Sequence, residues 1–236
     1  MIKKRILIKI SGGCFRPNKK DSLFDFNIIK KICLQIKQLA PKYNIGLVIG
    51  GGNIWRGNMD SNKILKRANS DYIGMLSTIA NGIVFKDVLE SMKVNVTLFS
   101  ALSIGNLTKP IVHDKIEKAF AKGNICIFAG GTGHPYFTTD TGCAIRAIDM
   151  RANIILMGKN SVNGVYTDDP LKNKKAKFIK DISFINLINK KLKVMDLSAL
   201  TLCEENNINI YVFNILAQNG IIKTLNKKCQ FTFIHK

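Results

Sequence analysis

The chain has 236 residues, 46% of them hydrophobic and 22% charged, and a formal net charge of +20. No apolar run approaches the ~20 residues that span a bilayer, and the apolar segment behind the basic start is too short for a signal peptide. These features argue against a membrane or exported protein and favour a cytoplasmic one. The six cysteines form no CxxC pair, and three histidines leave little material for a His-based metal centre.

Apolar runs of strand length alternate with helix-like periodicity along the chain. We expect strands at residues 5–10, 45–49, 94–99, 124–129, 153–157 and 208–213. We expect helices at residues 25–40, 71–92, 112–121, 140–151, 196–206 and 217–225. Near-continuous apolar strands are typical of a parallel sheet covered on both faces. The pattern therefore predicts a single α/β domain, a three-layer αβα sandwich around a mostly parallel sheet.

The first predicted strand ends in small residues. Lys9 stands near its end and is followed by Ser11 and Gly12. A lysine in a buried strand is costly unless its ammonium group has a partner. A nucleotide phosphate is a candidate partner, beside the Ser11 hydroxyl and the Gly12 N–H. The alternative is an edge lysine whose charged end reaches water.

The second predicted strand runs into three glycines, followed by Trp55 and Arg56. Consecutive glycines let the backbone approach a ligand closely, and successive N–H groups form an anion-binding concavity. Arg56 adds a planar cation suited to phosphate. The alternative is a glycine turn that only lets a helix pack tightly on the strand, and Trp55 is more typical of packing than of stacking on a ligand.

A third strand, at 124–129, opens into a glycine turn and then a Pro-aromatic-aromatic segment. Thr139 and Asp140 follow and resemble the start of a helix, because both residue types cap free N–H groups. A helix N-terminus also attracts anions. Tyr136 and Phe137 are read first as core residues and alternatively as a platform for a flat ligand.

After the fifth strand, Asn163 and Gly164 between β-branched residues predict a β-hairpin turn. The segment 166–170 behind it is expected to face a ligand, with Asp168 alternatively serving only the turn before Pro170. Residues 172–177, rich in Lys and Asn, are expected to form a surface loop.

The chemistry that these residues support is phosphoryl transfer. A P-loop and a G-x-G-x-x-G fingerprint are both absent, so the phosphate site must come from several strand ends. Asp71, Asp140, Asp169 and Asp196 stand near ends that face one edge, although Asp71 and Asp196 could each be a helix cap. Such chemistry needs positioning and charge neutralisation by cations, backbone amides and Mg²⁺.

The net charge has a second interpretation, a nucleic-acid-binding regulator. The lysine clusters at 172–177 and 190–193 lack interleaved aromatic residues, so we favour anionic small molecules as partners and expect no nucleic acid. A nucleotide sensor without catalysis is a third interpretation, which the presence of Lys9, Arg56, Asp169 and Asp196 argues against.

Six ordered motifs resemble the bacterial uridylate kinases, the UMP kinases of the amino acid kinase superfamily, over nearly the whole chain. The motifs cover residues 9–12, 50–57, 71–76, 131–140, 163–170 and 192–196. The resemblance implies the amino acid kinase fold and the reaction ATP + UMP → ADP + UDP, with Mg²⁺ held through the ATP phosphates and no protein metal site. It also implies a homo-oligomer, expected to be a hexamer.

The same resemblance implies a role for each matching residue. The catalytic residues would be Lys9, Arg56 and Asp196, the last orienting Lys9 or the metal-bound phosphates. ATP would be bound by Lys9, Ile10, Ser11, Gly12, Gly52, Arg56, Asn160, Tyr166 and Asp169. UMP would be bound by Gly51, Asp71, Thr132, Gly133, His134, Pro135, Tyr136, Phe137, Thr138 and Thr139. The cleft would have two lobes, with UMP on the side of residues 1–150 and ATP on the side of residues 151–236.

The chain departs from the family pattern in three places. Gly13 stands where the family usually has Glu, His134 where it has Asn, and Asn163 where it has Asp. Many members are activated by GTP through basic residues at a subunit interface. Here Glu90, Thr97 and the arginine-free stretch 110–120 are poorly suited, although Lys86 could serve, so we expect weak or absent GTP activation. Inhibition by UTP remains open.

Overall fold

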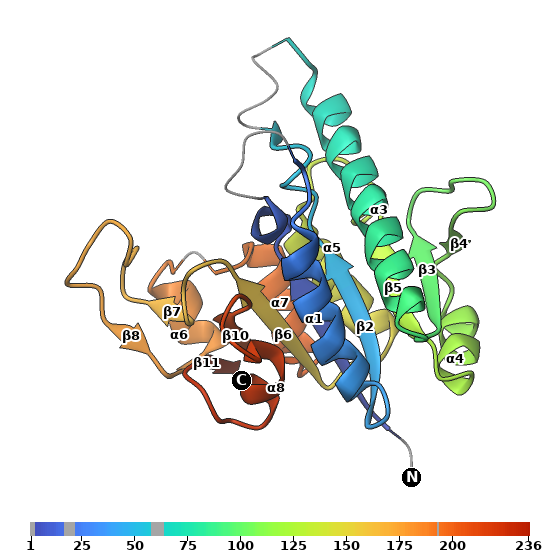
Figure 1. Ribbon diagram of the computed structural model, residues 1–236. Helices are drawn as coiled ribbons and strands as arrows, with labels where there is room; N and C mark the ends of the chain where they lie inside the picture. Colours follow the sequence, from blue (N-terminus) through green and yellow to red (C-terminus); the bar gives the residue numbers. More distant parts are fainter. Residues whose placement is uncertain (1–2, 17–21, 58–63, 193) are drawn as a thin grey trace.

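A computed structural model describes residues 3–16, 22–57, 64–192 and 194–236 (Figure 1). The strands of its main sheet are β1 (Lys4–Ile10), β2 (Tyr43–Ile49), β3 (Val96–Ser100), β4 (Lys109–Pro110), β5 (Ile125–Ala129), β6 (Ile154–Lys159), β9 (Asp181–Ser183), β10 (Asn209–Asn214) and β11 (Thr232–His235). Within the described residues they form one nine-stranded sheet in the order β4-β3-β5-β2-β1-β6-β10-β11-β9. Every neighbouring pair is parallel except β10 with β11. The predicted mostly parallel sheet is confirmed.

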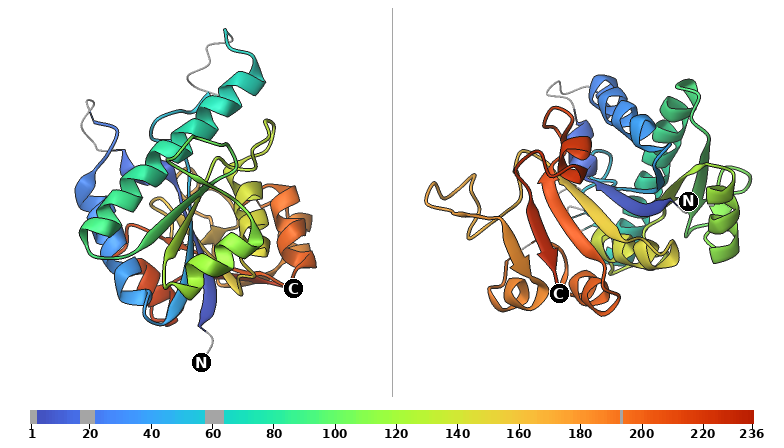
Figure 2. Two further views of the ribbon diagram at one scale, coloured as in Figure 1. Left: turned by 90° about the vertical axis from the view of Figure 1, so that its right-hand side faces the viewer. Right: turned by 90° about the horizontal axis from the view of Figure 1, so that it is seen from below.

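Helices cover both faces of this sheet (Figure 2). They are α1 (Phe26–Leu39), α3 (Arg67–Ser91), α4 (His113–Ala121), α5 (Thr139–Asp149), α6 (Phe184–Asn189), α7 (Leu197–Glu205) and α8 (Gly220–Leu225). A short 3₁₀ helix, η1 (Gly12–Phe15), follows β1. Helices α1, α3 and α8 pack on one face and α4 to α7 on the other, so the αβα sandwich is confirmed. No helix in the described ranges is long and apolar enough to cross a membrane.

The central strand β1 shows how the sequence divides between the two layers. Ile6, Ile8 and Ile10 belong to the core under α1 and α3, whereas Leu7 belongs to the core under α5 and α7. Successive side chains of a strand point to opposite faces. Lys9 therefore shares the face of Leu7 and is directed toward α5, although the strand is buried on both sides.

Several elements were absent from the sequence prediction: β4, β9, β11 and α6. Strands of two or three residues carry too little periodicity to detect, and α6 has only six residues. β11 is the antiparallel partner of β10 and connects the edge strand β9 to the sheet. Cys33 and Cys126 are both fully buried.

The predicted turn at Asn163 and Gly164 is wrong. The hairpin consists of β7 (Val165–Tyr166) and β8 (Phe178–Ile179), which pair antiparallel. The chain reverses through residues 167–177 instead. Neither Asn163 nor Gly164 has the positive φ that a type I′ turn requires.

Gly164 has a packing role in place of the turn role. A Cβ at this position would lie 2.8 Å from the Phe178 ring and 3.0 Å from the Thr232 backbone nitrogen. The Thr232 hydroxyl accepts the N–H of Val165 at 2.8 Å and donates to the carbonyl of Ile179 at 2.5 Å. The glycine thus lets β11 hold both strands of the hairpin, and this tertiary contact overrides the local turn preference.

Candidate active site

The first two glycine turns meet at the carboxyl ends of β1 and β2. The N–H of Gly50 donates to the carbonyl of Ile10 at 2.9 Å. A Cβ on Gly12 would lie 2.6 Å from the nitrogen of Gly52, and one on Gly51 would lie 2.8 Å from the carbonyl oxygen of Gly74 in α3. The alternative that the second glycine turn lets a helix pack closely therefore holds for Gly51, against α3, whereas Gly12 packs against the second glycine turn itself. It does not exclude ligand contact, because Gly51 and Gly52 also line a cavity.

Helix α3 holds two of the glycine turns through buried polar side chains. Asn81 is fully buried; its amide donates to the carbonyl of Gly50 and to Asn53 Oδ1, both at 2.7 Å, and its Oδ1 accepts from Asn53 at 3.0 Å. One turn earlier, the Thr78 hydroxyl accepts the N–H of Gly130 at 2.8 Å. Buried polar groups are costly unless hydrogen-bonded, so these contacts fix both turns relative to α3.

A cavity of about 360 Å³, here called the α3 cavity, lies between these turns and α3. The UMP candidates that line it are Gly51, Asp71, Tyr136, Phe137, Thr138 and Thr139, together with the ATP candidates Gly52 and Arg56. Thr132, Gly133, His134 and Pro135 are not among the residues that line it. The Thr132 hydroxyl instead bonds both backbone groups of His134, donating at 3.0 Å and accepting at 3.1 Å. This part of the segment shapes the loop in the structure.

Asp71 is not a helix cap. Helix α3 begins at Arg67, which places Asp71 in its second turn, where Oδ2 accepts the N–H of Tyr136 at 2.8 Å. Tyr136 has a φ of 72°, and the Arg67 guanidinium lies 5.4 Å from its ring. Tyr136 and Phe137 are 63% and 54% exposed, so the core interpretation of both is wrong. Trp55 donates from Nε1 to Ser70 Oγ at 3.0 Å and also lines the α3 cavity.

Lys9 forms an ion pair with Asp140 on α5, with Nζ 2.8 Å from Oδ1. Lys9 is 8% exposed, so the alternative of an edge lysine reaching water is wrong. Burial lowers the pKa of Lys9, but the charge and hydrogen bond of Asp140 outweigh it and leave that pKa above its ordinary value. The lysine is therefore held charged at the carboxyl end of β1, between β2 and β6.

Asp196 stands at the N-cap position of α7, but its side chain makes no cap hydrogen bond. Its Oδ2 instead accepts a hydrogen bond from the hydroxyl of Thr138, just before α5, and another at 3.3 Å from the hydroxyl of Thr141 on α5. Thr138 is itself the N-cap of α5 and accepts the N–H of Asp140 at 3.0 Å. The starts of the two helices are thereby joined. The carboxylate that pairs with Lys9 is Asp140, a residue that the resemblance did not assign to the site.

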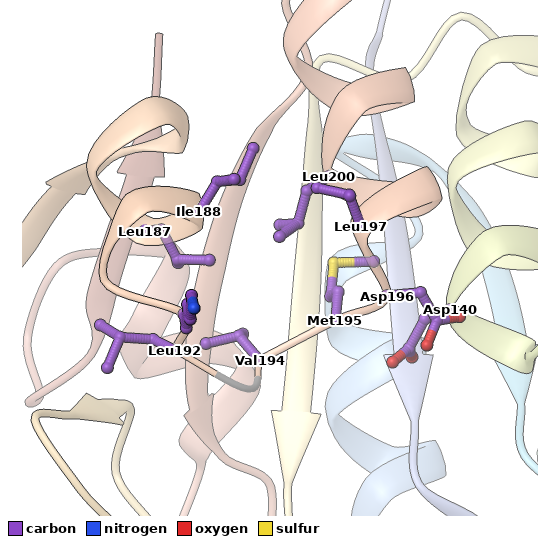
Figure 3. Close-up of a pocket in the computed structure, with 10 residues that line it drawn as sticks. Asp140, Leu187, Ile188, Leu192, Val194, Met195, Asp196, Leu197 and Leu200 are labelled. Carbon is purple, nitrogen blue, oxygen red and sulfur yellow. The ribbon is translucent and has the colours of Figure 1, made fainter.

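Two further cavities lie on the side of β6 and β10. One, the α7 cavity, has about 480 Å³ and is lined by Asp140, Asp196 and apolar residues of α6 and α7; Figure 3 shows the two carboxylates next to one another at one end. The other, the hairpin cavity, has about 600 Å³ and is lined by Lys159, Tyr166 and Asp169 among others. Both share Lys191, Leu192 and Val194, so they adjoin. Lys193, which stands between Leu192 and Val194 in the sequence, lies outside the described residues.

The remaining ATP candidates are distributed around these cavities. Asn160 lines neither, and its Oδ1 accepts from the hydroxyl of Ser161 at 3.0 Å. Asp169 lines the hairpin cavity and accepts the N–H of Leu171 at 3.0 Å. Asp168 has the predicted turn role, accepting from Asp169 N–H at 2.7 Å and Asn173 at 2.8 Å; these bonds lower the pKa of its carboxyl group.

Arg56 donates from Nε to the carbonyl of Gly52, in the second glycine turn, at 2.8 Å. A Cβ on Gly13 would lie 3.1 Å from Arg56 Nη2. The departure at Gly13 therefore falls directly beside the arginine. Ile10 is fully buried and can offer a ligand only its backbone.

Two residues of the site were missed or left unassigned by sequence reasoning, Asp140 and Lys159. Lys159 ends β6 and donates from Nζ to the carbonyl of Val194 at 2.7 Å. The available signal was the one used for Lys9, a lysine at the end of an apolar central strand. Within the described ranges, no cluster of three or more His, Cys, Asp or Glu side chains is arranged to hold a metal ion.

Comparisons with known proteins agree with this geometry. The chain matches the amino acid kinase family over residues 4–214. It is 44% identical to the uridylate kinase of Ureaplasma parvum, with all of both chains covered, and 44% identical to that of Mycoplasma pneumoniae, covering 98% and 99%. Crystal structures of UMP kinase from U. parvum (TM-score 0.96, 44% identity, 100% of each chain) and Bacillus anthracis (TM-score 0.91, 32% identity, 98% and 96%) share the fold. The chain therefore belongs to the amino acid kinase family and, within it, to the uridylate kinases.

Proposed function

We propose that this protein transfers the γ-phosphoryl group of ATP to the phosphate of UMP, giving ADP and UDP. The observation that carries the proposal is the charged pair of Lys9 and Asp140. It stands at the end of the strand between β2, which leads to the α3 cavity, and β6, which leads to the hairpin cavity. A cation in that position neutralises charge that passes between two phosphates.

UMP is assigned to the α3 cavity, on the side of residues 1–150. Its phosphate would meet the backbone of Gly51 and the guanidinium of Arg56, a planar donor that suits phosphate. The Asp71 carboxylate would accept hydrogen bonds from the ribose hydroxyls. Tyr136 and Phe137 are exposed side chains that line the cavity, and aromatic rings of this kind stack on a uracil base.

ATP is assigned to the side of residues 151–236, with its phosphates reaching Ser11, Gly12 and Gly52 and its nucleoside next to Tyr166 and Asp169. The attacking group is an anionic phosphate oxygen of UMP, so the reaction needs no general base. Lys9 would hold the transferring phosphoryl group, and Arg56 would stand at the junction of the two nucleotides. The protein then acts by positioning and by electrostatic stabilisation.

The residues present fit Mg²⁺ that is bound chiefly through ATP. Asp140 and Asp196 line the same cavity, and Mg²⁺ is usually held by one or two carboxylates together with substrate phosphates and water. The ion would supply neutralisation of the phosphate charge. Asp196 would keep its hydroxyl contacts to Thr138 and Thr141 and so hold α5 and α7 in register.

The proposal is tested by measuring ADP release from Mg-ATP with UMP, CMP, dUMP, carbamate, acetylglutamate and isopentenyl phosphate as acceptors. We expect turnover with UMP, and loss of that turnover in Lys9→Ala. The matched control is Lys118→Ala, an exposed lysine on α4, which should keep wild-type turnover. Turnover with a different acceptor, or full activity in Lys9→Ala, contradicts the proposal.

We also propose a cytoplasmic homohexamer with weak or absent GTP activation. Lys86 is engaged by Glu90 at 3.9 Å, and Thr97 is buried and accepts from Asn124 at 2.9 Å, so this surface offers little free charge to a triphosphate. Light scattering in solution tests the hexamer. A GTP titration at subsaturating ATP should change the rate little or not at all, and a several-fold stimulation would refute the expectation. A UTP titration in the same assay decides whether the end product inhibits.

A further inference from the structure

Lys159 lies on the same face of the sheet as Lys9. On β6, Ile155 and Met157 belong to the core under α5 and α7, and Lys159 follows them at the same two-residue spacing. Met157 is the register partner of Lys9 on the neighbouring strand. The two lysines are therefore diagonal neighbours on one face at the carboxyl edge of the sheet, with Lys159 two residues beyond the register partner of Lys9, and Lys159 lines the hairpin cavity.

The surroundings of Lys159 leave its charge incompletely matched. An ammonium group has three N–H donors, and within the described residues Lys159 makes one hydrogen bond, to the carbonyl of Val194. Burial first, and then the charge of Lys9, lower the pKa of Lys159, while Asp140 and Asp196 act in the opposite direction. Asp140 is already paired with Lys9. A partly buried cation in this state favours an added anion.

We propose that Lys159 binds the phosphate chain of the donor nucleotide while it keeps its hydrogen bond to Val194. Val194 belongs to the segment that runs into Asp196 and forms the wall shared by the α7 and hairpin cavities. One ammonium group then links the bound phosphates to the segment that carries Asp196. This inference rests on the proposed function for the identity of the anion, and it assigns Lys159 a role that Lys9 does not fill.

The test separates charge from the structural hydrogen bond. Lys159→Gln keeps a donor for the Val194 carbonyl but removes the positive charge, whereas Lys159→Arg keeps the charge. Calorimetric titration of the full-length protein with ATP and with AMP gives affinities that do not depend on turnover. Lys180→Gln is the matched control, an exposed lysine between β8 and β9 that does not line the hairpin cavity.

We expect Lys159→Gln to weaken the binding of ATP roughly ten- to hundred-fold, which is the effect of losing one hydrogen bond to a charged group. The affinity for AMP should change far less. Lys159→Arg should retain most of the ATP affinity, and Lys180→Gln all of it. Equal losses for ATP and AMP in Lys159→Gln, or no loss for either, overturn the proposal, as does a wild-type protein that does not bind ATP. Binding of ATP without turnover of UMP would instead contradict the proposed reaction and leave the assignment of Lys159 standing.

Discussion

Replacement of Asp140 by Asn should destabilise the protein by leaving Lys9 as an uncompensated buried charge. The two side chains are 10% and 18% exposed and their charged atoms lie 2.8 Å apart. Breaking a buried ion pair by removing one partner costs about 3–5 kcal/mol, whereas replacing both partners is often nearly neutral. We therefore expect Asp140→Asn to lose about 3–5 kcal/mol of unfolding free energy and Lys9→Met/Asp140→Asn to recover most of it.

The pH dependence of stability should also change sign in the single variant. In the wild type the pKa of Lys9 is raised, so its stabilising contribution is complete below the unfolded pKa of about 10.5 and is lost only as the pH rises through the folded value. Without Asp140, burial, the largest influence on Lys9, outweighs the smaller raising effects of Cys143 and Cys14 and lowers the folded pKa of Lys9 below the unfolded one. The unfolded state then binds more protons, and the stability of Asp140→Asn should rise with pH up to about 10.5.

Urea unfolding at pH 7 and pH 9.5 measures both effects, with Glu90→Gln as the control. Glu90 and Lys86 form an exposed pair on α3, with side chains 43% and 35% accessible and atoms 3.9 Å apart. Such surface pairs contribute about 0–1 kcal/mol. The reasoning is refuted if Asp140→Asn loses no more than Glu90→Gln, or if the double variant is as unstable as the single one.

Three further predictions follow from the site. Gly12→Ala should unfold the protein at lower urea and abolish activity, because its Cβ meets the Gly52 backbone, whereas Gly13→Ala meets only a flexible arginine and should fold normally; equal effects in a paired urea titration would contradict this. Asn81→Ala should cost about 1–3 kcal/mol for each buried group it orphans, and a loss below 1 kcal/mol would show that its bonds in the glycine turn contribute little. Asp71→Asn should raise the KM for UMP while the KM for ATP stays constant, and a parallel rise in both would remove Asp71 from the UMP site.

Local signals in the sequence predicted much of the layered fold. Buried strands, glycine turns and helix caps such as Asp25, which accepts from the N–H groups of Asn27 and Ile28, depend on residues close in sequence. The functional importance of the strand that carries Lys9 was recognisable for the same reason, because a lysine buried among apolar residues requires a partner for its charge.

Tertiary contacts decided the rest. In the sequence, Asp71, Asp140 and Asp196 all stand near predicted helix starts or strand ends, so nothing local distinguishes them. The packing of α5 against β1 is what makes Asp140 the partner of Lys9. The prediction of a turn at Asn163 and Gly164 failed because the hydroxyl of Thr232, distant in sequence, hydrogen-bonds to both strands of the hairpin. Asp71 and Asp196 were ambiguous as caps until the structure gave their side chains other partners.

The central claim is that phosphate passes from ATP to UMP across the carboxyl end of β1, where Lys9 stands. A ³¹P NMR time course with Mg-ATP and UMP reports on this directly. It gives separate signals for the γ-phosphate of ATP, which disappears, and for the β-phosphate of UDP, which appears. The account predicts equal loss and gain in the wild type and neither in Lys9→Ala. Release of inorganic phosphate without UDP, or UDP formation that continues in Lys9→Ala, would contradict it.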